Sequence, residues 1–159
     1  MIKQDWEYQI GYLSEAVREF GYEIVEQTDT EDRVEHQERV VYINSRSHPE
    51  TRFYTLLHEY GHIEISETAA VEFAADHPMY IHADDGRSAR TSAYKVSLLA
   101  EEIEAWKRGR WFARNESLYV DDVKYDKNMT DCVMSYIDWA ATSSRNSSKG
   151  STADATVEV

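Results

Sequence analysis

A five-residue motif, His58-Glu59-Tyr60-Gly61-His62, constrains this chain more than any other part of it. In an α-helix, residues four apart lie on one face, so His58 and His62 can direct ring nitrogens at the same ion. Glu59 would lie beside that ion without binding it, where a carboxylate can take a proton from a water. Two core histidines without a metal are the alternative interpretation, and they would need other hydrogen-bond partners.

The segment around the motif, from about residue 49 to 65, has the composition of a buried helix. Apolar residues flank the histidines on both sides: Tyr54, Leu56, Leu57, Ile63 and Ile65. Pro49 and Glu50 suit the first turn of a helix, and His48 could cap it. Gly61 costs a helix interior about 1 kcal/mol relative to alanine, which predicts that a neighbouring backbone or helix packs tightly against this turn.

An open zinc site takes three protein ligands, so a third ligand has to come from another part of the chain. A third histidine six residues after the motif is excluded, because that position is Thr68. A second helix is predicted at about residues 92–115, and Glu102 falls within its apolar arc, whereas Glu101 and Glu104 fall outside it. Glu102 is therefore the predicted ligand. An ion pair between this carboxylate and an arginine is the alternative.

Other polar side chains compete for roles near the metal. His77 and His82 are rival ligands because they lie closer in sequence to the motif. One of them, or Tyr80 or Tyr94, is expected to donate a hydrogen bond to the oxyanion, and the sequence does not choose among the four. His36 stands in polar surroundings and is expected at the surface.

Composition excludes several other classes of protein. Seventeen Lys and Arg against 30 Asp and Glu give a formal net charge of −13, which repels phosphate backbones and argues against direct binding of nucleic acid. The single cysteine, Cys132, excludes internal disulfides and a cysteine-rich zinc site, and we expect it in the core. No apolar run is long enough to span a membrane, and the first residues lack a signal-peptide pattern, so we expect a cytoplasmic protein.

The remaining pattern predicts an α+β fold in one domain, residues 1–141, followed by a flexible Ser/Thr/Ala-rich tail, residues 142–159. Helices are predicted at 4–20, closed by Gly21, at 49–65, at 92–115, capped by Thr91 or Ser92, and from about Thr130. Strands are predicted at 22–25 and 40–43, with a polar loop or hairpin at 26–38 between them. The segment at 66–90 is predicted to be partly irregular. We expect a minimal zincin-like domain, in which a small sheet packs on the motif helix beside the glutamate helix and flanking helices.

Two stretches of the chain resemble the ImmA/IrrE family of zinc metallopeptidases. They are Val40-Val41-Tyr42-Ile43-Asn44 and the segment from Arg52 to Ile63. The order of strand, motif helix and glutamate helix also matches, and the resemblance covers about residues 38–114. In that family the third ligand lies in a Glu-x-x-Ala pattern, which here is Glu102-Ile103-Glu104-Ala105. The resemblance implies a zinc-dependent peptidase with a general base at Glu59 and zinc ligands at His58, His62 and Glu102.

The chain departs from the family pattern directly after Ala105. It reads Trp106-Lys107-Arg108 where family members usually have a small polar residue, and the spacing between His62 and Glu102 is long. We therefore expect a different cleft. Some relatives cleave helix-turn-helix repressors, and similar compact domains are familiar from phage genomes, so the resemblance implies a protein substrate, with a regulatory protein such as a repressor as one possibility. It does not identify that protein.

Three functional hypotheses remain from the sequence. The first is peptide hydrolysis, in which the strand at residues 40–44 holds an extended substrate through backbone hydrogen bonds. The second is an acidic binding or inhibitor protein on a zincin fold, and the third is a metal-dependent hydrolase of a non-peptide substrate. An intact Glu59 favours an enzyme, because a binding protein has no use for a general base.

Overall fold

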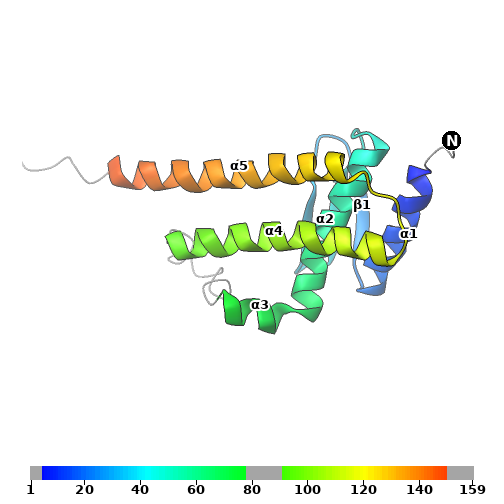
Figure 1. The fold of residues 1–159 in the computed structure, drawn as a ribbon, viewed down its shortest axis with the longest axis horizontal. Helices are drawn as coiled ribbons and strands as arrows, with labels where there is room; N and C mark the ends of the chain where they lie inside the picture. Colours follow the sequence, from blue (N-terminus) through cyan, green and yellow to red (C-terminus); the bar gives the residue numbers. More distant parts are fainter. Residues whose placement is uncertain (1–4, 78–90, 150–159) are drawn as a thin grey trace, which may run out of the picture.

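The computed structural model describes residues 5–77 and 91–149, with side chains as far as residue 142. Its elements are α1 (Trp6–Glu19), β1 (Glu23–Gln27), β2 (Arg33–Glu35), β3 (Val40–Asn44), α2 (Pro49–Thr68), α3 (Ala70–Asp76), α4 (Ser92–Asn115) and α5 (Asp122–Lys149). They form the predicted α+β fold of a minimal zincin-like domain (Figure 1).

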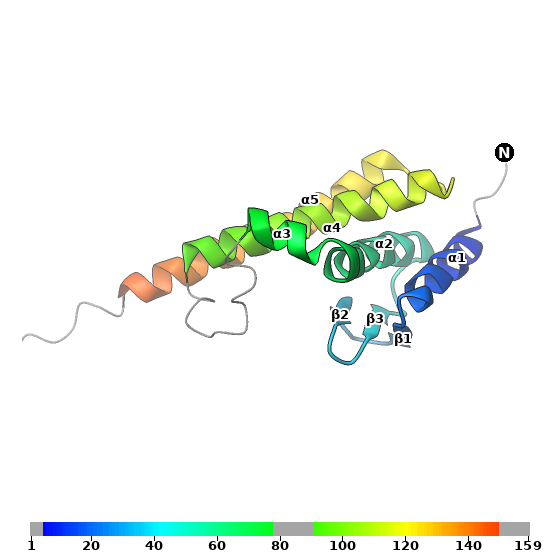
Figure 2. The ribbon, with the colours of Figure 1, turned by 90° about the horizontal axis from the view of Figure 1, so that it is seen from below.

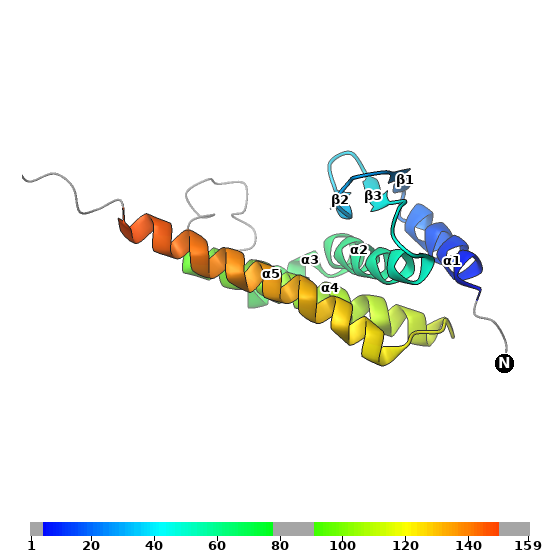
Figure 3. The ribbon, with the colours of Figure 1, turned by 90° about the horizontal axis from the view of Figure 1, so that it is seen from above.

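Helix α2, which carries the motif, lies in the middle of the molecule. The small sheet lies on one side of it, and α4 and α5 lie together on the other side (Figures 2 and 3). Helix α2 contacts α1, α3, α4, α5, β2 and β3. This position buries the motif between the sheet and the α4–α5 pair, as predicted from its apolar flanks.

The sheet has the strand order β1-β3-β2, with β1 parallel and β2 antiparallel to the central strand β3. Strand β2 lies in the polar stretch predicted as a loop or hairpin. Val40, Val41 and Tyr42 have partners on both sides, and the Asn44 N–H donates to Asp32 Oδ1 at 2.6 Å. The prediction that β3 holds an extended substrate is therefore wrong. The outer strand on the motif side is β2.

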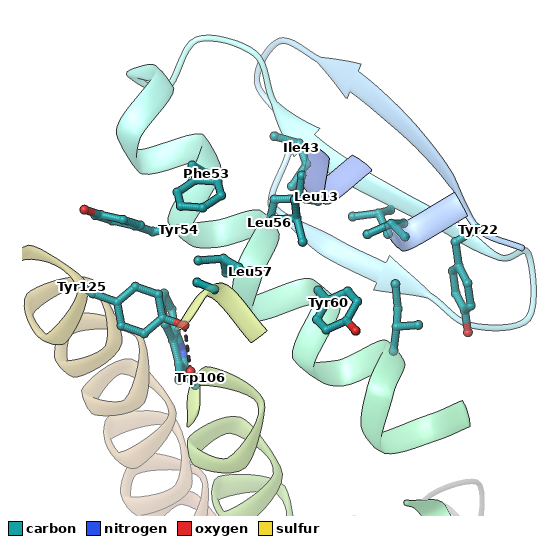
Figure 4. Close-up of a cluster of buried hydrophobic side chains, with 14 residues drawn as sticks. Leu13, Tyr22, Ile43, Phe53, Tyr54, Leu56, Leu57, Tyr60, Trp106 and Tyr125 are labelled. Carbon is teal, nitrogen blue, oxygen red and sulfur yellow. Dashed lines mark hydrogen bonds between the residues drawn. The ribbon is translucent and has the colours of Figure 1, made fainter. Parts of the chain in front are cut away.

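The core lies between α1, the sheet, α2 and the α4–α5 pair. Helix α1 contributes Leu13 and Val17, both fully buried. It ends at Glu19, and Gly21 closes it as predicted, with a φ of 83° that suits a residue without a side chain. Figure 4 shows aromatic rings from three helices meeting in this core, and the Tyr125 hydroxyl donates to the Trp106 carbonyl at 2.7 Å. The first turns of α5 are thereby fixed to α4.

Helix α5 differs from its prediction at both ends. It begins at Asp122 instead of about Thr130, because the Asp121 side chain accepts hydrogen bonds from the N–H groups of Val123 and Lys124 at 3.1 and 3.2 Å. It continues past residue 142, the predicted start of the flexible tail, to Lys149. The last ten residues lie outside the described part, so the division into domain and tail stays a prediction. Over the described ranges, no helix is both long and apolar enough to cross a membrane.

Candidate metal centre

The candidate site forms where α2 and α4 touch backbone to backbone. A Cβ atom on Gly61 would lie 2.0 Å from the Ala105 carbonyl oxygen, and one on Gly109 would lie 2.3 Å from the Leu57 carbonyl oxygen. The tight packing predicted at Gly61 is therefore confirmed, and the occupant is α4. This close approach lets short side chains from the two helices reach one point.

Three predicted ligands meet beside this contact. His58 Nε2 lies 3.0 Å from His62 Nε2 and 3.0 Å from Glu102 Oε2, and His62 Nε2 lies 3.3 Å from Glu102 Oε1. Both His58 and Glu102 are buried, at 7% and 4% exposure. Nitrogen and oxygen donors at this spacing can face a single ion.

Glu101, the alternative to Glu102, approaches His62 from the side opposite to His58. Its Oε1 lies 3.0 Å from His62 Nδ1, the ring nitrogen directed away from His58. The helical arc predicted that Glu101 faces away from the core, but it is buried at 7% exposure, because His62 of α2 covers that side of α4. The two glutamates thus take different positions, one beside Nε2 and one beside Nδ1.

Charge and burial oppose each other in this cluster. Burial acts to raise the pKa of Glu102, but hydrogen bonds from His58 and His62 outweigh it and lower that pKa. Burial likewise acts to lower the pKa of His62, and the carboxylates of Glu101 and Glu102 raise it well above its ordinary value. The cluster therefore stabilises positive charge between the two helices, which is the condition for holding a cation.

Glu59 lies at the edge of the same cluster. It is 4% exposed, and its Oε1 is 3.4 Å from His58 Nδ1. Its carboxylate is close enough to form a possible metal-binding group with the two histidines. Glu102 approaches both Nε2 atoms more closely, so the geometry favours Glu102 as the third donor and leaves Glu59 beside the ion.

A cavity of about 400 Å³ opens over the cluster. The sheet side contributes Asp32, Arg33, Val34 and His36, and the helices contribute Thr55, His58, Glu59, His62, Glu101, Glu102, Trp106, Asn128, Cys132 and Tyr136. The ring of Trp106 stacks on His58 with centroids 4.4 Å apart. Trp106, the first residue at which the chain departs from the family pattern, is thus part of the cavity wall. The expected difference in the cleft stays a prediction.

The rival residues take other positions. His77 ends α3 and packs on Phe73, with ring centroids 4.6 Å apart, and neither it nor Tyr94 lines the cavity. Tyr80 and His82 lie outside the described residues. His48 caps α2 as predicted, by accepting from the Glu50 N–H. His36 is exposed as predicted, at the rim of the cavity.

Sequence reasoning missed several cavity residues, three of them on α5. Asn128, Cys132 and Tyr136 follow one another at a spacing of four on α5, a signal that was available but that the late predicted start of the helix hid. Cys132, expected in the core, is half-buried: it packs against the core cluster and also lines the cavity, and burial raises the pKa of its thiol to about 11. Asp32 precedes a three-residue strand, and no pattern singles it out.

The donor set fits a divalent metal on its own chemistry. Two neutral imidazoles 3.0 Å apart can share only one proton between their facing nitrogens, whereas one cation satisfies both nitrogens and the carboxylate at once. Metal-dependent peptidase domains are a class defined by four such features. These are a sheet packed on a helix, two histidines on that helix, a glutamate beside the first histidine, and a further glutamate on a second helix.

The sequence profile of the IrrE N-terminal-like domain, peptidase family M78, matches residues 18–102. The chain belongs to this family, and the resemblance identified from the motif is confirmed. The matched segment includes the motif and ends at Glu102, so most of α4 and all of α5 lie beyond it. Comparisons with curated proteins and with solved structures found no match.

Proposed function

We propose that the protein is a zinc-dependent metallopeptidase that hydrolyses peptide bonds in a specific intracellular protein, with zinc held by His58, His62 and Glu102. The meeting of these three donors within 3.0 to 3.3 Å of one another carries the proposal. Membership of a metallopeptidase family supports the same reaction. When bound, zinc supplies a Lewis acid at this point of the cavity.

The chain's own residues supply the proton transfers. The Glu59 carboxylate is buried in the cavity wall beside His58, where it takes a proton from the attacking water and returns it to the leaving nitrogen. Glu101 holds His62 through Nδ1, so that Nε2 is directed at the metal. Trp106 covers one face of the His58 ring and keeps water from that side.

The substrate segment lies along β2 in this proposal. Arg33 and Val34 of this strand line the cavity, and β2 is paired only with β3 in the sheet. An extended peptide that pairs with the free edge of β2 would gain backbone hydrogen bonds and run past the zinc ligands. This arrangement replaces β3, the central strand, as the place where substrate binds.

Charge supports a basic protein as the target. The net charge of −13 attracts cationic surfaces and speeds their association, and the cavity wall itself carries carboxylates from Asp32, Glu59 and Glu101. A DNA-binding regulatory protein such as a repressor has the surface charge that such an enzyme would attract. The enzyme itself needs no contact with nucleic acid.

A glutamate-to-glutamine change in α2 tests the proposal. Glu59→Gln should retain stoichiometric zinc, measured by elemental analysis, and lose cleavage. New protein termini should appear in cells that make the wild-type protein and not in cells that make the variant. Glu67→Gln, two turns further along α2 and outside the cavity, is the matched control and should keep producing those termini.

Other outcomes distinguish the remaining hypotheses. Unchanged biological activity in Glu59→Gln would favour an acidic binding protein, and activity that depends on Glu59 without any new protein termini would favour a non-peptide substrate. Glu102→Ala that keeps near-stoichiometric zinc would contradict the ligand assignment and return attention to Glu101.

A further inference from the structure

The cavity has a wall that the family match does not include. Asn128, Cys132 and Tyr136 of α5 line the cavity opposite the sheet, and the spacing of four places them on one face of the helix. Helix α5 begins well after Glu102, the last matched residue. The family match therefore assigns no role to these side chains.

Cys132 reaches the candidate metal centre from this face. Its Sγ lies 3.8 Å from Glu102 Oε2, and donor atoms of Cys132, Glu102 and His58 all lie within 4.8 Å of one another, close enough to share one ion. Thiolate sulfur is among the strongest zinc ligands in proteins and combines readily with histidine and carboxylate. Cys132 is the only cysteine among these 159 residues, so it has no disulfide partner within them.

The neighbouring indole group points to the same sulfur. Trp106 is 2% exposed and lines the cavity, and its Nε1–H is one of the few buried polar groups in the described part of the chain without a hydrogen-bond partner. Cys132 lines the same cavity as this indole. A sulfur that carries negative charge would be the acceptor that the buried N–H lacks.

We propose that Cys132 is a fourth metal ligand, which closes the site in the resting protein. The inference rests on the proposed metal centre of His58, His62 and Glu102. The thiol releases its proton to solvent as the sulfur–metal bond forms, and the Trp106 N–H donates to the bound sulfur. A site with four protein ligands has no open position, so the sulfur must leave before a peptide can be hydrolysed. Helix α5 is then a built-in inhibitor of the site.

Cobalt in place of zinc provides a direct test on the full chain. Cobalt(II) bound by a thiolate gives an intense sulfur-to-metal charge-transfer band in the near ultraviolet, in addition to weaker visible bands from the metal. We expect this band in the wild-type protein and in Met134→Leu, a matched control that removes an exposed sulfur from the same helix. Cys132→Ser should lose the band and keep the visible bands.

The outcomes separate this inference from the metal centre on which it rests. Visible cobalt bands without a charge-transfer band in the wild-type protein would overturn the cysteine ligand and leave the other three standing. Absence of bound cobalt in every protein would overturn both. Because Cys132 is the only thiol, its reaction with a thiol reagent should also slow on zinc loading and recover with a chelator. A reaction rate independent of zinc would contradict the proposal.

Discussion

Glu101 lies where a side chain can support a metal ligand without itself binding the metal. Its contact with His62 Nδ1 fixes the ring orientation and leaves Nε2 for the cluster, which is the arrangement of carboxylate, histidine and metal in many enzymes. We expect Glu101→Gln to lower zinc affinity about 10- to 100-fold, the range usual for residues that hold a ligand in place. Competition with a chromophoric chelator would measure the change.

Glu104 provides the control for that prediction. It lies on the same helix, and its carboxylate pairs with Arg108 at 3.0 Å instead of entering the cavity. Glu104→Gln should bind zinc as tightly as the wild type. Equal losses in the two variants would indicate a general effect of charge and not a specific contact with His62.

For single residues, the sequence predicted which ligands face the site better than it predicted which side chains from other helices cover them. The helical arc and the Glu-x-x-Ala pattern both selected Glu102, and the structure brings it to the histidines. The same arc placed Glu101 outside the buried face. Helical periodicity is read from the apolar residues of one helix, so it contains no information on a histidine from another helix that covers a carboxylate. Tyr136 belongs to the helix predicted from about Thr130, and nothing in that pattern indicated that it lines the cavity. Its role depends on where α5 crosses, which no local pattern encodes.

The contact between α2 and α4 depends on two glycines, and Gly61 tests it. In Gly61→Ala the new Cβ would meet the Ala105 backbone at 2.0 to 2.8 Å, so the helices would have to separate. We expect a loss of about 1–3 kcal/mol in the free energy of unfolding, the usual cost of overpacking, measured by urea denaturation. Zinc binding should weaken as well, because the ligands come from both helices.

Gly11 of α1 is the matched control for this change. A Cβ at Gly11 has no atom within 4 Å, so alanine meets no obstacle and gains helix propensity. Gly11→Ala should stabilise the protein by about 0.5–1 kcal/mol. Stabilisation by Gly61→Ala as well would show that the backbone contact is not rigid.

The start of α5 allows a second prediction, on the stability that its capping residue provides. Asp121 accepts two backbone N–H hydrogen bonds in the first turn, so Asp121→Ala should cost about 0.5–2 kcal/mol of stability. Asp131→Ala, which removes only an exposed pair with Lys127, should change stability by about 0.5 kcal/mol or less. Denaturation midpoints of the two variants would separate the effects.

The elements that were not predicted from the sequence were missed for one physical reason, which is that their signal is not local. Strand β2 spans three residues in a polar stretch and exists because β3 pairs with it, so its signal is not local. The first turns of α5 bury only Tyr125 among mostly exposed neighbours, which gives no apolar periodicity to read. Long helices with capping residues, such as α4 after Thr91, were predicted within a residue or two.

The whole molecule combines a core and a metal site that lie side by side. The core cluster joins α1, the sheet, α2, α4 and the start of α5, and the proposed ligands come from α2 and α4 alone. We expect the metal-free protein to stay folded and zinc to add stability. At one hundred times its dissociation constant, zinc should add about 2.7 kcal/mol to the free energy of unfolding.

Unfolding curves with zinc and with a chelator would measure that gain. His58→Ala should abolish it, and His48→Ala, which changes a helix cap away from the cavity, should retain it. An identical gain in His58→Ala would mean that zinc binds elsewhere on this acidic protein.

Helix α5 approaches the metal ligands from a part of the chain that the family profile does not describe. If Cys132 closes the site as proposed, the side chain that withholds the metal and the side chains that would hydrolyse a peptide lie on different helices. A substitution on the cavity face of α5 would then change when the site opens, and the histidines and the glutamate would keep their positions.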